Sequence, residues 1–214
     1  LSNIQFPGIQ SLTNSEGILS FNDNEGYKYF DLPTQTVVES YADETMDITA
    51  TYLDYIYSLD TEEGVIYRHT KRGDTLNTTE WGASDTFNNA ASMTITYSIY
   101  VTTHDGTTGF IEKFTSGEKD PFELTNIPGE LSIDLAISTY QTFENIYIAD
   151  KGNKRIVVVN QDGEFVKQYK TEAEDTWDDI KDITVTEDEN YLYVLNGTKI
   201  YVIGLKVEST EAEE

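Results

Sequence analysis

The sequence contains no cysteine and only four prolines, two histidines, two tryptophans and 14 basic residues in 214. The absence of cysteine excludes disulfides, thiolate metal sites and cysteine nucleophiles. No apolar run approaches the roughly 18 residues of a membrane-spanning helix, and no basic-then-apolar leader opens the chain. We therefore expect no membrane insertion. The first residue, Leu1, is not a methionine and indicates a processed or excised piece.

Charge is the strongest compositional signal. The 39 acidic residues against 14 basic ones give a formal net charge of −25. Such a surface repels nucleic-acid phosphates and anionic membranes, so we expect no nucleic-acid partner. It favours cations or the basic surface of a protein partner instead. The alternative is that the acids only keep a β-rich protein soluble. The acidity and the mature-looking start favour the cell envelope or the extracellular space.

A strand-like triplet recurs five times along the chain, and its third position falls at 20, 57, 100, 147 and 193. The triplets are Ile18–Ser20, Tyr55–Tyr57, Ser98–Tyr100, Asn145–Tyr147 and Tyr191–Tyr193. A period of about 40–50 residues with several short strands per unit is typical of propeller blades. The sequence therefore predicts an all-β fold, a β-propeller of about five four-stranded blades.

The predicted propeller is a single domain over residues 1–205. Its blades cover about 9–40, 46–80, 92–125, 131–170 and 181–205, each with strands a to d running outward from the axis. The outer d strands are predicted at Thr36–Glu39, Thr75–Thr79, Phe122–Leu124 and Glu164–Tyr169.

The fifth blade has no convincing d strand, because residues 206–214 form an acidic tail that we expect to be disordered. The segment Leu1–Gly8 resembles Leu124–Gly129, the segment that leads into the fourth blade. We therefore predict that Leu1–Phe6 pairs with the last blade as its outer strand, closing the ring and covering an exposed edge. In an excised piece, the complete ring could hold six or more blades.

The best-formed unit is NIYIADKGNKRIVVVNQDGEFVKQY, residues 145–169. Within it, the residues Asp150, Gly152, Asn153, Arg155 and Ile156 resemble the core of an NHL repeat. This resemblance implies a propeller blade. It leaves the activity open, because propellers of this type range from protein and RNA binding to lyase and hydrolase chemistry.

Asp150 and Arg155 flank the turn between strands b and c of this unit. We expect a cross-strand ion pair that stabilises the turn by up to about 1 kcal/mol if it is exposed. The alternative is a contact with a ligand. Asn153 is expected to adopt the left-handed conformation, which short amide side chains tolerate.

Calcium is the one cofactor that the sequence suggests, through acidic residues only. Asp47, Asp134 and Asp182 fall near a-strand ends and could meet at the axial channel. Asp23 lies in an oxygen-rich stretch that lacks the distal glutamate of an EF-hand. The alternative is that all four are solvated strand ends and hairpin tips.

Both tryptophans are predicted in connections from a d strand to the next a strand. Trp81 lies in Thr75–Ser92, the longest such segment, and Trp177 lies beside an acidic cluster that includes Asp175, Asp178 and Asp179. A tryptophan in a polar loop either anchors that loop or serves as an interface hot spot. Because connections carry binding on a rigid scaffold, we predict that this face receives a partner with a basic surface.

These observations favour a non-enzymatic binding or scaffolding propeller that presents the loops of one face to a protein. One alternative is a calcium-dependent hydrolase or lyase with its site at the central channel. No GxSxG motif or closely spaced histidine pair supports this chemistry. Another alternative is a structural domain of a larger surface or sensor protein.

Overall fold

The computed structural model describes residues 11–15, 18–23, 26–31, 33–41, 46–53, 55–72, 75–140, 142–172, 177–186 and 188–205. For residues 11–15, 18–20, 22 and 23, only the backbone is described. Among the described residues there are 19 strands and one short 3-10 helix, so the all-β prediction is confirmed. No helix in these ranges has the length and apolar character needed to span a membrane.

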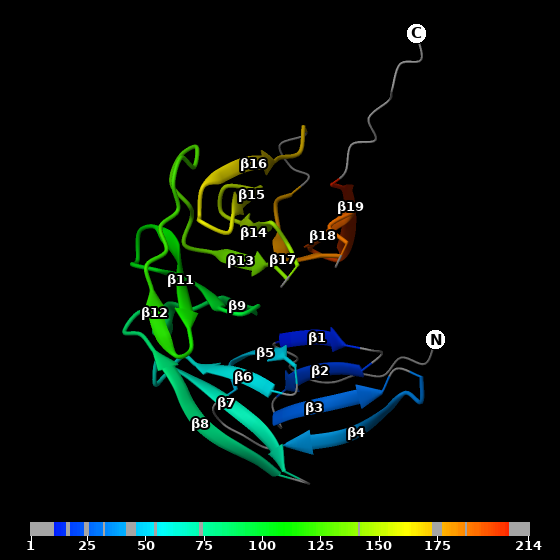
Figure 1. The fold of residues 1–214 in the computed structure, drawn as a ribbon. Coiled ribbons are helices and arrows are strands. Elements are labelled where there is room, and N and C mark those ends of the chain that lie inside the picture. Colours follow the sequence, from blue (N-terminus) through cyan, green and yellow to red (C-terminus); the bar gives the residue numbers. More distant parts are fainter. Residues whose placement is uncertain are drawn as a thin grey trace.

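The strands form five antiparallel sheets, each built from strands that follow one another in the sequence (Figure 1). Blade one contains β1 (Ser11–Ser15), β2 (Ile18–Asp23), β3 (Gly26–Asp31) and β4 (Thr36–Tyr41). Blade two contains β5 (Ile48–Tyr52), β6 (Tyr55–Asp60), β7 (Val65–Arg72) and β8 (Thr75–Ala83), followed by the 3-10 helix η1 (Phe87–Asn89). Blade three contains β9 (Ser92–Ile95), β10 (Ile99–His104), β11 (Gly109–Thr115) and β12 (Glu118–Asp120). Blade four contains β13 (Leu135–Ser138), β14 (Asn145–Asp150), β15 (Arg155–Asn160) and β16 (Phe165–Tyr169). Blade five contains β17 (Ile180–Val185), β18 (Tyr191–Asn196) and β19 (Lys199–Gly204).

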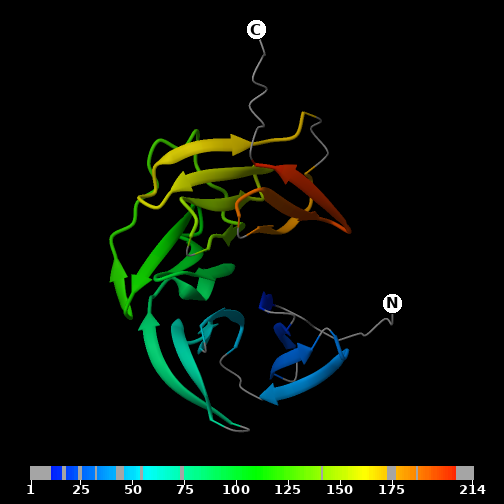
Figure 2. The same cartoon turned by 45° about the vertical axis from the view of Figure 1, so that its right-hand side comes forward.

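The five sheets follow one another around an arc, with blades one and five at its two ends (Figure 2). The first strands of consecutive blades, β1, β5, β9, β13 and β17, lie side by side on the inside of this arc. Apolar clusters fill the junctions between consecutive blades. A single sheet cannot cover both of its apolar faces, so stacking of neighbours creates the core. This arrangement is that of a β-propeller.

Blade four shows why its central strands are almost continuously apolar. Ile146 and Ile148 face the cluster shared with blade three, whereas Tyr147 and Ala149 face the cluster shared with blade five. Both faces of the sheet are therefore covered, and the usual alternation of apolar and polar residues disappears.

Among the described residues, only one face of blade five is covered. Leu192 and Val194 are buried against blade four, whereas Ile200 and Val202 on the opposite face are 67% and 58% exposed. This apolar face lies at the end of the arc. The predicted closing strand, Leu1–Phe6, and the tail 206–214 lie outside the described residues.

One predicted strand position is wrong. The outer strand of blade three is Glu118–Asp120 and not Phe122–Leu124, because the chain turns back tightly at Ser116–Gly117. Gly117 and Ser116 both have positive φ, which this turn requires. The predicted outer strand Thr75–Thr79 of blade two is present and extends to Ala83 as β8, so the connection that follows it is shorter than predicted.

Candidate protein-binding face

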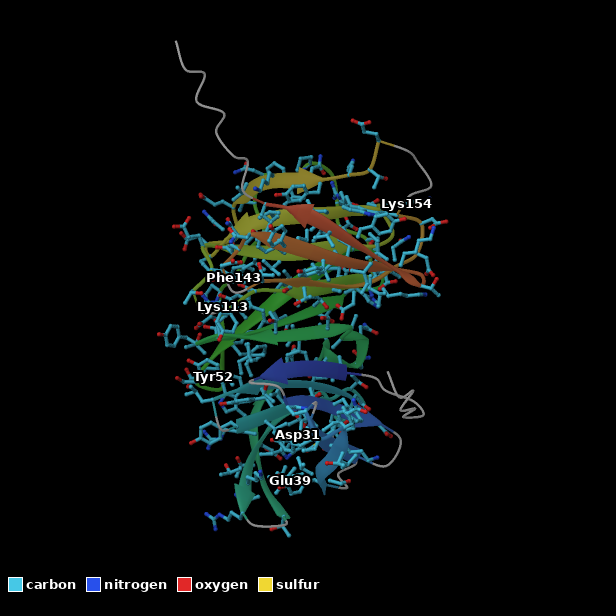
Figure 3. All side chains as sticks on the ribbon, turned by 90° about the vertical axis from the view of Figure 1, so that its right-hand side faces the viewer. Asp31, Glu39, Tyr52, Lys113, Phe143 and Lys154 are labelled. Carbon is cyan, nitrogen blue, oxygen red and sulfur yellow. The ribbon has the colours of Figure 1, made fainter. Side chains whose placement is uncertain are left out.

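The turns between the second and third strands of each blade share one face with the connections between blades, because neighbouring strands run in opposite directions. Lys154, in such a turn, and Tyr52, at the end of β5, lie toward opposite edges of the molecule (Figure 3). We call the first edge the acidic loop face. Its turns and connections expose the carboxylates of Glu62, Glu63, Asp85, Asp105, Glu130, Asp134, Asp178 and Asp179.

Hydrogen bonds hold the loops of this face in fixed positions. In blade two, Asp47 accepts hydrogen bonds from the backbone N–H and the hydroxyl of Thr61, both at 2.7 Å. Asp60 accepts the backbone N–H groups of Glu62 and Glu63 at 2.9 Å. The two glutamates therefore project from a turn whose backbone is anchored at both ends.

The strongest anchor is the ion pair between Asp150 and Arg155. Arg155 Nε lies 2.6 Å from Asp150 Oδ2, and the two side chains are only 4% and 0% exposed. The expected cross-strand pair is present and is buried, because the connection that precedes β13 lies over it. The Arg155 guanidinium donates to the carbonyls of Pro128 and Glu130, and Asp150 Oδ1 accepts the N–H of Ser132.

The same network controls the ionisation of Asp150. Burial alone would raise the pKa of this carboxyl, but hydrogen bonds from Ser132, Asn153 and Arg155 outweigh burial and hold the pKa below its usual value. Asn153 contributes through its side chain, whose amide also donates to the carbonyl of Glu130. Its expected left-handed conformation is wrong, because Lys154 is the residue of this turn with positive φ.

The three calcium candidates whose side chains are described, Asp47, Asp134 and Asp182, are not brought together. Asp47 is bonded to Thr61, and Asp134 lies 2.9 Å from the Lys151 ammonium. Asp182 Oδ1 accepts the N–H of Ile183, and partial burial raises the pKa of the Asp182 carboxyl. The side chain of Asp23 is not among those described. Among the described residues, no group of three or more histidine, aspartate or glutamate side chains could hold a metal ion.

The tryptophan predictions need correction. Trp81 lies in β8 and not in a connection, and its ring packs edge-on against Tyr57 at 5.5 Å. Trp177 lies in the connection before β17 but is only 3% exposed, so it anchors the connection and offers almost no surface to a partner.

Of the three acidic residues named near Trp177, the structure describes two. Asp178 and Asp179 are exposed, and Asp179 forms an exposed ion pair with Lys181. Asp175 lies outside the described residues. Of the described members of this group, Asp178 and Asp179 both expose their side chains to a partner.

A feature that sequence reasoning missed lies between blades three and four. After β12 the chain leaves the sheet and arches outward over residues 121–131, a segment that we call the arch. At Thr125 the arch pairs with Glu164 of blade four, and at Leu131 its carbonyl accepts the N–H of Gly109 from β11. The arch is therefore fixed to blade four at its top and to blade three at its end.

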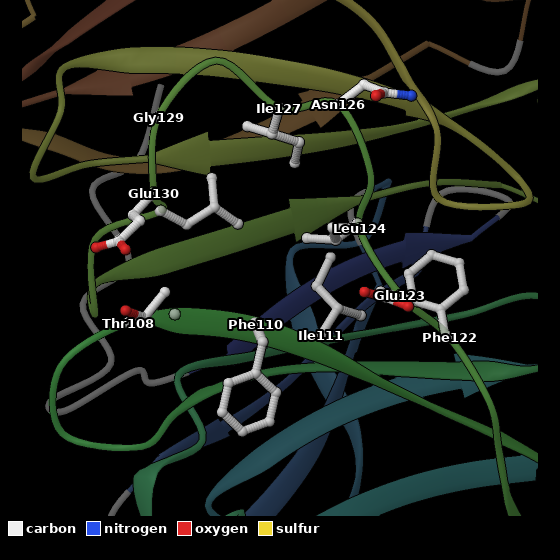
Figure 4. Close-up of a pocket in the computed structure, with 12 residues that line it drawn as sticks. Thr108, Phe110, Ile111, Phe122, Glu123, Leu124, Asn126, Ile127, Gly129 and Glu130 are labelled. Atoms are coloured by element: carbon white, nitrogen blue, oxygen red, sulfur yellow. The ribbon is translucent and has the colours of Figure 1, made fainter.

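A pocket of about 390 Å³ lies between the arch and β11 (Figure 4). Its apolar lining comes from Phe110 and Ile111 of β11 and from Phe122, Leu124, Ile127 and Leu131 of the arch. Glu123 and Glu130 supply exposed carboxylates at its rim. Its volume lies in the range of pockets that receive small ligands or the side chains of a partner.

The sequence did contain a signal for the arch. Pro121 follows β12 directly and has no N–H to continue the ladder along β11. Pro128 and Gly129 then mark a second turn. The apolar residues Phe122 and Leu124 conceal this signal, because they also fit an outer strand.

No protein-family model and no curated protein sequence matches this chain. Its fold is similar to that of solved propeller structures at low sequence identity. The nidogen/laminin complex aligns with a TM-score of 0.71 and 13% identity over 92% of this chain and 76% of that one. Virginiamycin B lyase from Staphylococcus aureus aligns with a TM-score of 0.60 and 16% identity, over 94% and 71%. PorZ, a surface component of the type-IX secretion system of Porphyromonas gingivalis, aligns with a TM-score of 0.63 and 13% identity, over 93% and 25%.

The structural comparisons and the arc of stacked blades indicate the same class of protein. It is a β-propeller. Propellers with this likeness include a lyase and proteins solved as binding partners or surface components, so the fold alone selects no activity.

Proposed function

We propose that this chain is a non-enzymatic binding propeller whose acidic loop face receives a protein partner with a basic surface. One observation supports the proposal: exposed carboxylates gather on loops that hydrogen bonds hold in fixed positions. Of the basic residues in the turns of that face, Lys151 is already paired with Asp134. Pre-organised charges lose little entropy when they bind, and a field of one sign attracts and orients a partner of the other.

A location in the cell envelope or outside the cell forms part of this proposal. It is supported by the acidic surface and by the likeness to a bacterial surface component and to nidogen. We also propose that blade four is an NHL-type blade, on the strength of Asp150, Gly152, Asn153 and Arg155. In this blade, the aspartate and the arginine of the pattern form the buried anchor.

The test uses two triple variants that change the net charge equally. The first neutralises the acidic loop face with Glu62→Gln, Asp85→Asn and Asp178→Asn. The second neutralises exposed acids of the opposite face with Glu118→Gln, Glu144→Gln and Asp162→Asn. No described hydrogen bond or ion pair uses these six side chains, so both variants should fold. The probe is cytochrome c, a small basic protein, measured by calorimetry at low and moderate salt.

We expect the first variant to weaken binding at least about threefold and the second to leave it nearly unchanged, with both effects shrinking as salt increases. Equal weakening by the two variants would show that the total charge, and not this face, attracts the probe, and would overturn the proposal.

A calcium-dependent enzyme remains the alternative hypothesis, and a thermal melt separates it from the binding propeller. A ligand that binds only the folded state must raise the melting temperature by mass action. We expect millimolar calcium followed by EDTA to leave the melt unchanged, since Asp47 and Asp134 already have protein partners. A reversible rise would favour the enzyme.

A further inference from the structure

The outer edge of β19 is unpaired in the part of the chain that the structure describes. In blades one to four, the third strand lies between the second strand and an outer strand, β4, β8, β12 or β16. In blade five the third strand is β19, and it pairs with β18 alone. The open edge runs along all six residues of Lys199–Gly204, in the blade that ends the arc (Figure 1).

Three consecutive ladder positions of this edge are open. In an antiparallel ladder, every second residue directs its N–H and C=O toward the same neighbour. The N–H of Leu205 donates to the carbonyl of Asn190, just before β18, so Leu205 faces β18. By alternation, Ile200, Val202 and Gly204 face outward, and no described residue forms a hydrogen bond with their outward groups. Another strand therefore has room to pair along the whole edge.

The surface around this edge is apolar and contains no carboxylate. Ile200 and Val202 are exposed on one face, and a Cβ at Gly204 on that face would meet no described atom within 4 Å apart from those of its chain neighbours. Tyr191–Leu205 contains one charged residue, Lys199. Two copies of a chain with a net charge of −25 repel each other, and this repulsion is smaller where carboxylates are absent.

β19 is complementary to itself in one antiparallel register. With Val202 opposite Val202 of a second copy, Ile200 of each copy lies opposite Gly204 of the other, so every outward residue exchanges two hydrogen bonds with its counterpart. On the other face of the joined sheet, Tyr201 of each copy lies opposite Ile203 of the other. Pairs of an aromatic and a β-branched residue stabilise antiparallel sheets, and no like charges lie opposite each other in this register.

The segment that the sequence predicts for this edge, Leu1–Phe6, matches it less well. In a strand, Ile4 and Phe6 would lie on one face, whereas Asn3 and Gln5 would lie on the other. A second β19 offers apolar side chains to both faces of the sheet. The pattern of side chains therefore favours a second copy of the chain at this edge.

We propose that β19 pairs with β19 of a second copy of this chain, antiparallel and centred on Val202, so that the two fifth blades form one continuous sheet. The same edge is used by both copies, so the contact closes a two-fold dimer and leaves no free edge for further addition. Pairing also removes an open apolar edge, which is otherwise a site of aggregation. The proposal does not depend on the acidic loop face or its partner.

Sedimentation at moderate salt, which screens the net charge, measures the association. We expect a monomer–dimer equilibrium with a dissociation constant on the order of 100 μM, because the contact is small. Val202→Lys places two lysines opposite each other at the two-fold axis and should weaken the dimer at least about tenfold. The matched control is Val38→Lys, a similarly exposed valine of blade one, which should leave the association nearly unchanged.

A cysteine substitution tests the register, because the chain has no cysteine of its own. In the proposed dimer the two Val202 Cα atoms lie about 5.5 Å apart, as in other hydrogen-bonded pairs, and a disulfide can bridge that separation. Val202→Cys should therefore form a covalent dimer under mild oxidation much faster than Val38→Cys.

Three results would each overturn the proposal. They are a wild type that stays monomeric at millimolar concentration, equal weakening by the two lysine variants, and equal rates of disulfide formation by the two cysteine variants. Pairing of the edge with Leu1–Phe6 of the same chain would give the first and third of these results. None of them bears on the acidic loop face, whose test uses other residues and another probe.

Discussion

Ile156 and Ile200 hold the same place in consecutive blades, yet Ile156 is completely buried and Ile200 is 67% exposed. Each pairs with the next-to-last residue of the preceding strand, Ala149 in blade four and Leu195 in blade five. Each points away from the preceding blade. Blade five covers Ile156, whereas the corresponding face of blade five lies at the end of the arc.

This difference predicts opposite outcomes for one substitution at two sites. Ile156→Lys places a charge in a closed cluster and should lower the free energy of unfolding by about 3 kcal/mol or more. Ile200→Lys should change it by less than about 0.5 kcal/mol and reduce self-association, because it breaks an exposed apolar face. Urea unfolding and light scattering measure the two effects. A large loss of stability in Ile200→Lys would show that this face is covered in the folded protein.

The buried ion pair of blade four leads to a second prediction. Arg155→Met removes the cation but leaves Asp150 buried without its partner, and it frees the carbonyls of Pro128 and Glu130. Breaking a buried pair in this way costs about 3–5 kcal/mol. The matched control is Lys181→Met, which breaks the exposed pair with Asp179 and should cost less than about 1 kcal/mol. Similar losses in the two variants would mean that the Arg155 network does not secure the connection.

Asp150 also makes part of the stability depend on pH. Its pKa is lowered in the folded protein, so its contribution is fully present above the pKa of the unfolded side chain, about 3.9. The contribution is lost as the pH falls through the lowered pKa of the folded state. The difference in unfolding free energy between the wild type and Asp150→Asn should therefore shrink below about pH 4. A difference that stays constant from pH 6 to pH 2.5 would contradict the lowered pKa.

Gly109 is where the arch closes onto β11. A Cβ at this position would lie 2.1 Å from the carbonyl oxygen of Ser132 and 2.7 Å from a methyl carbon of Leu135. Gly109→Ala must therefore push the end of the arch away, and we expect a loss of about 1–3 kcal/mol. Gly106→Ala is the control in the same turn: it has open space around it but positive φ, so it should lose only about 1 kcal/mol. Hydrogen exchange of the amide of residue 109 should be faster than in the wild type in Gly109→Ala and unchanged in Gly106→Ala. If the amide of residue 109 exchanges as slowly in Gly109→Ala as in the wild type, the contact between the end of the arch and β11 is not what protects it.

Most of the fold could be predicted from the sequence, because each blade is built from strands that are consecutive along the chain. Hairpin turns and the strand triplets identify consecutive strands, and these strands pair with each other. The repeat period then places the blades in order. The position of Phe122–Leu124 was missed, because these apolar residues conceal the signal of Pro121 and because the pairing of Thr125 with the distant Glu164 leaves no local pattern.

The candidate site was harder to predict for the same reason. The pairing of Asp150 with Arg155 follows from their places beside one turn, but their burial depends on a connection that lies 25 to 27 residues before Arg155. The burial of Trp177 likewise depends on the cluster between blades four and five. The pocket under the arch exists only because a strand is missing, and an absent strand leaves little trace in a hydrophobic pattern.

The most direct test of the central claim is an unbiased selection of short peptides from a random display library, followed by NMR mapping of the best binder. The account predicts sequences rich in lysine and arginine, and shifted amides in the turns and connections of the acidic loop face. Selected sequences without basic residues, or shifts confined to the face that carries Glu118, Glu144 and Asp162, would contradict it.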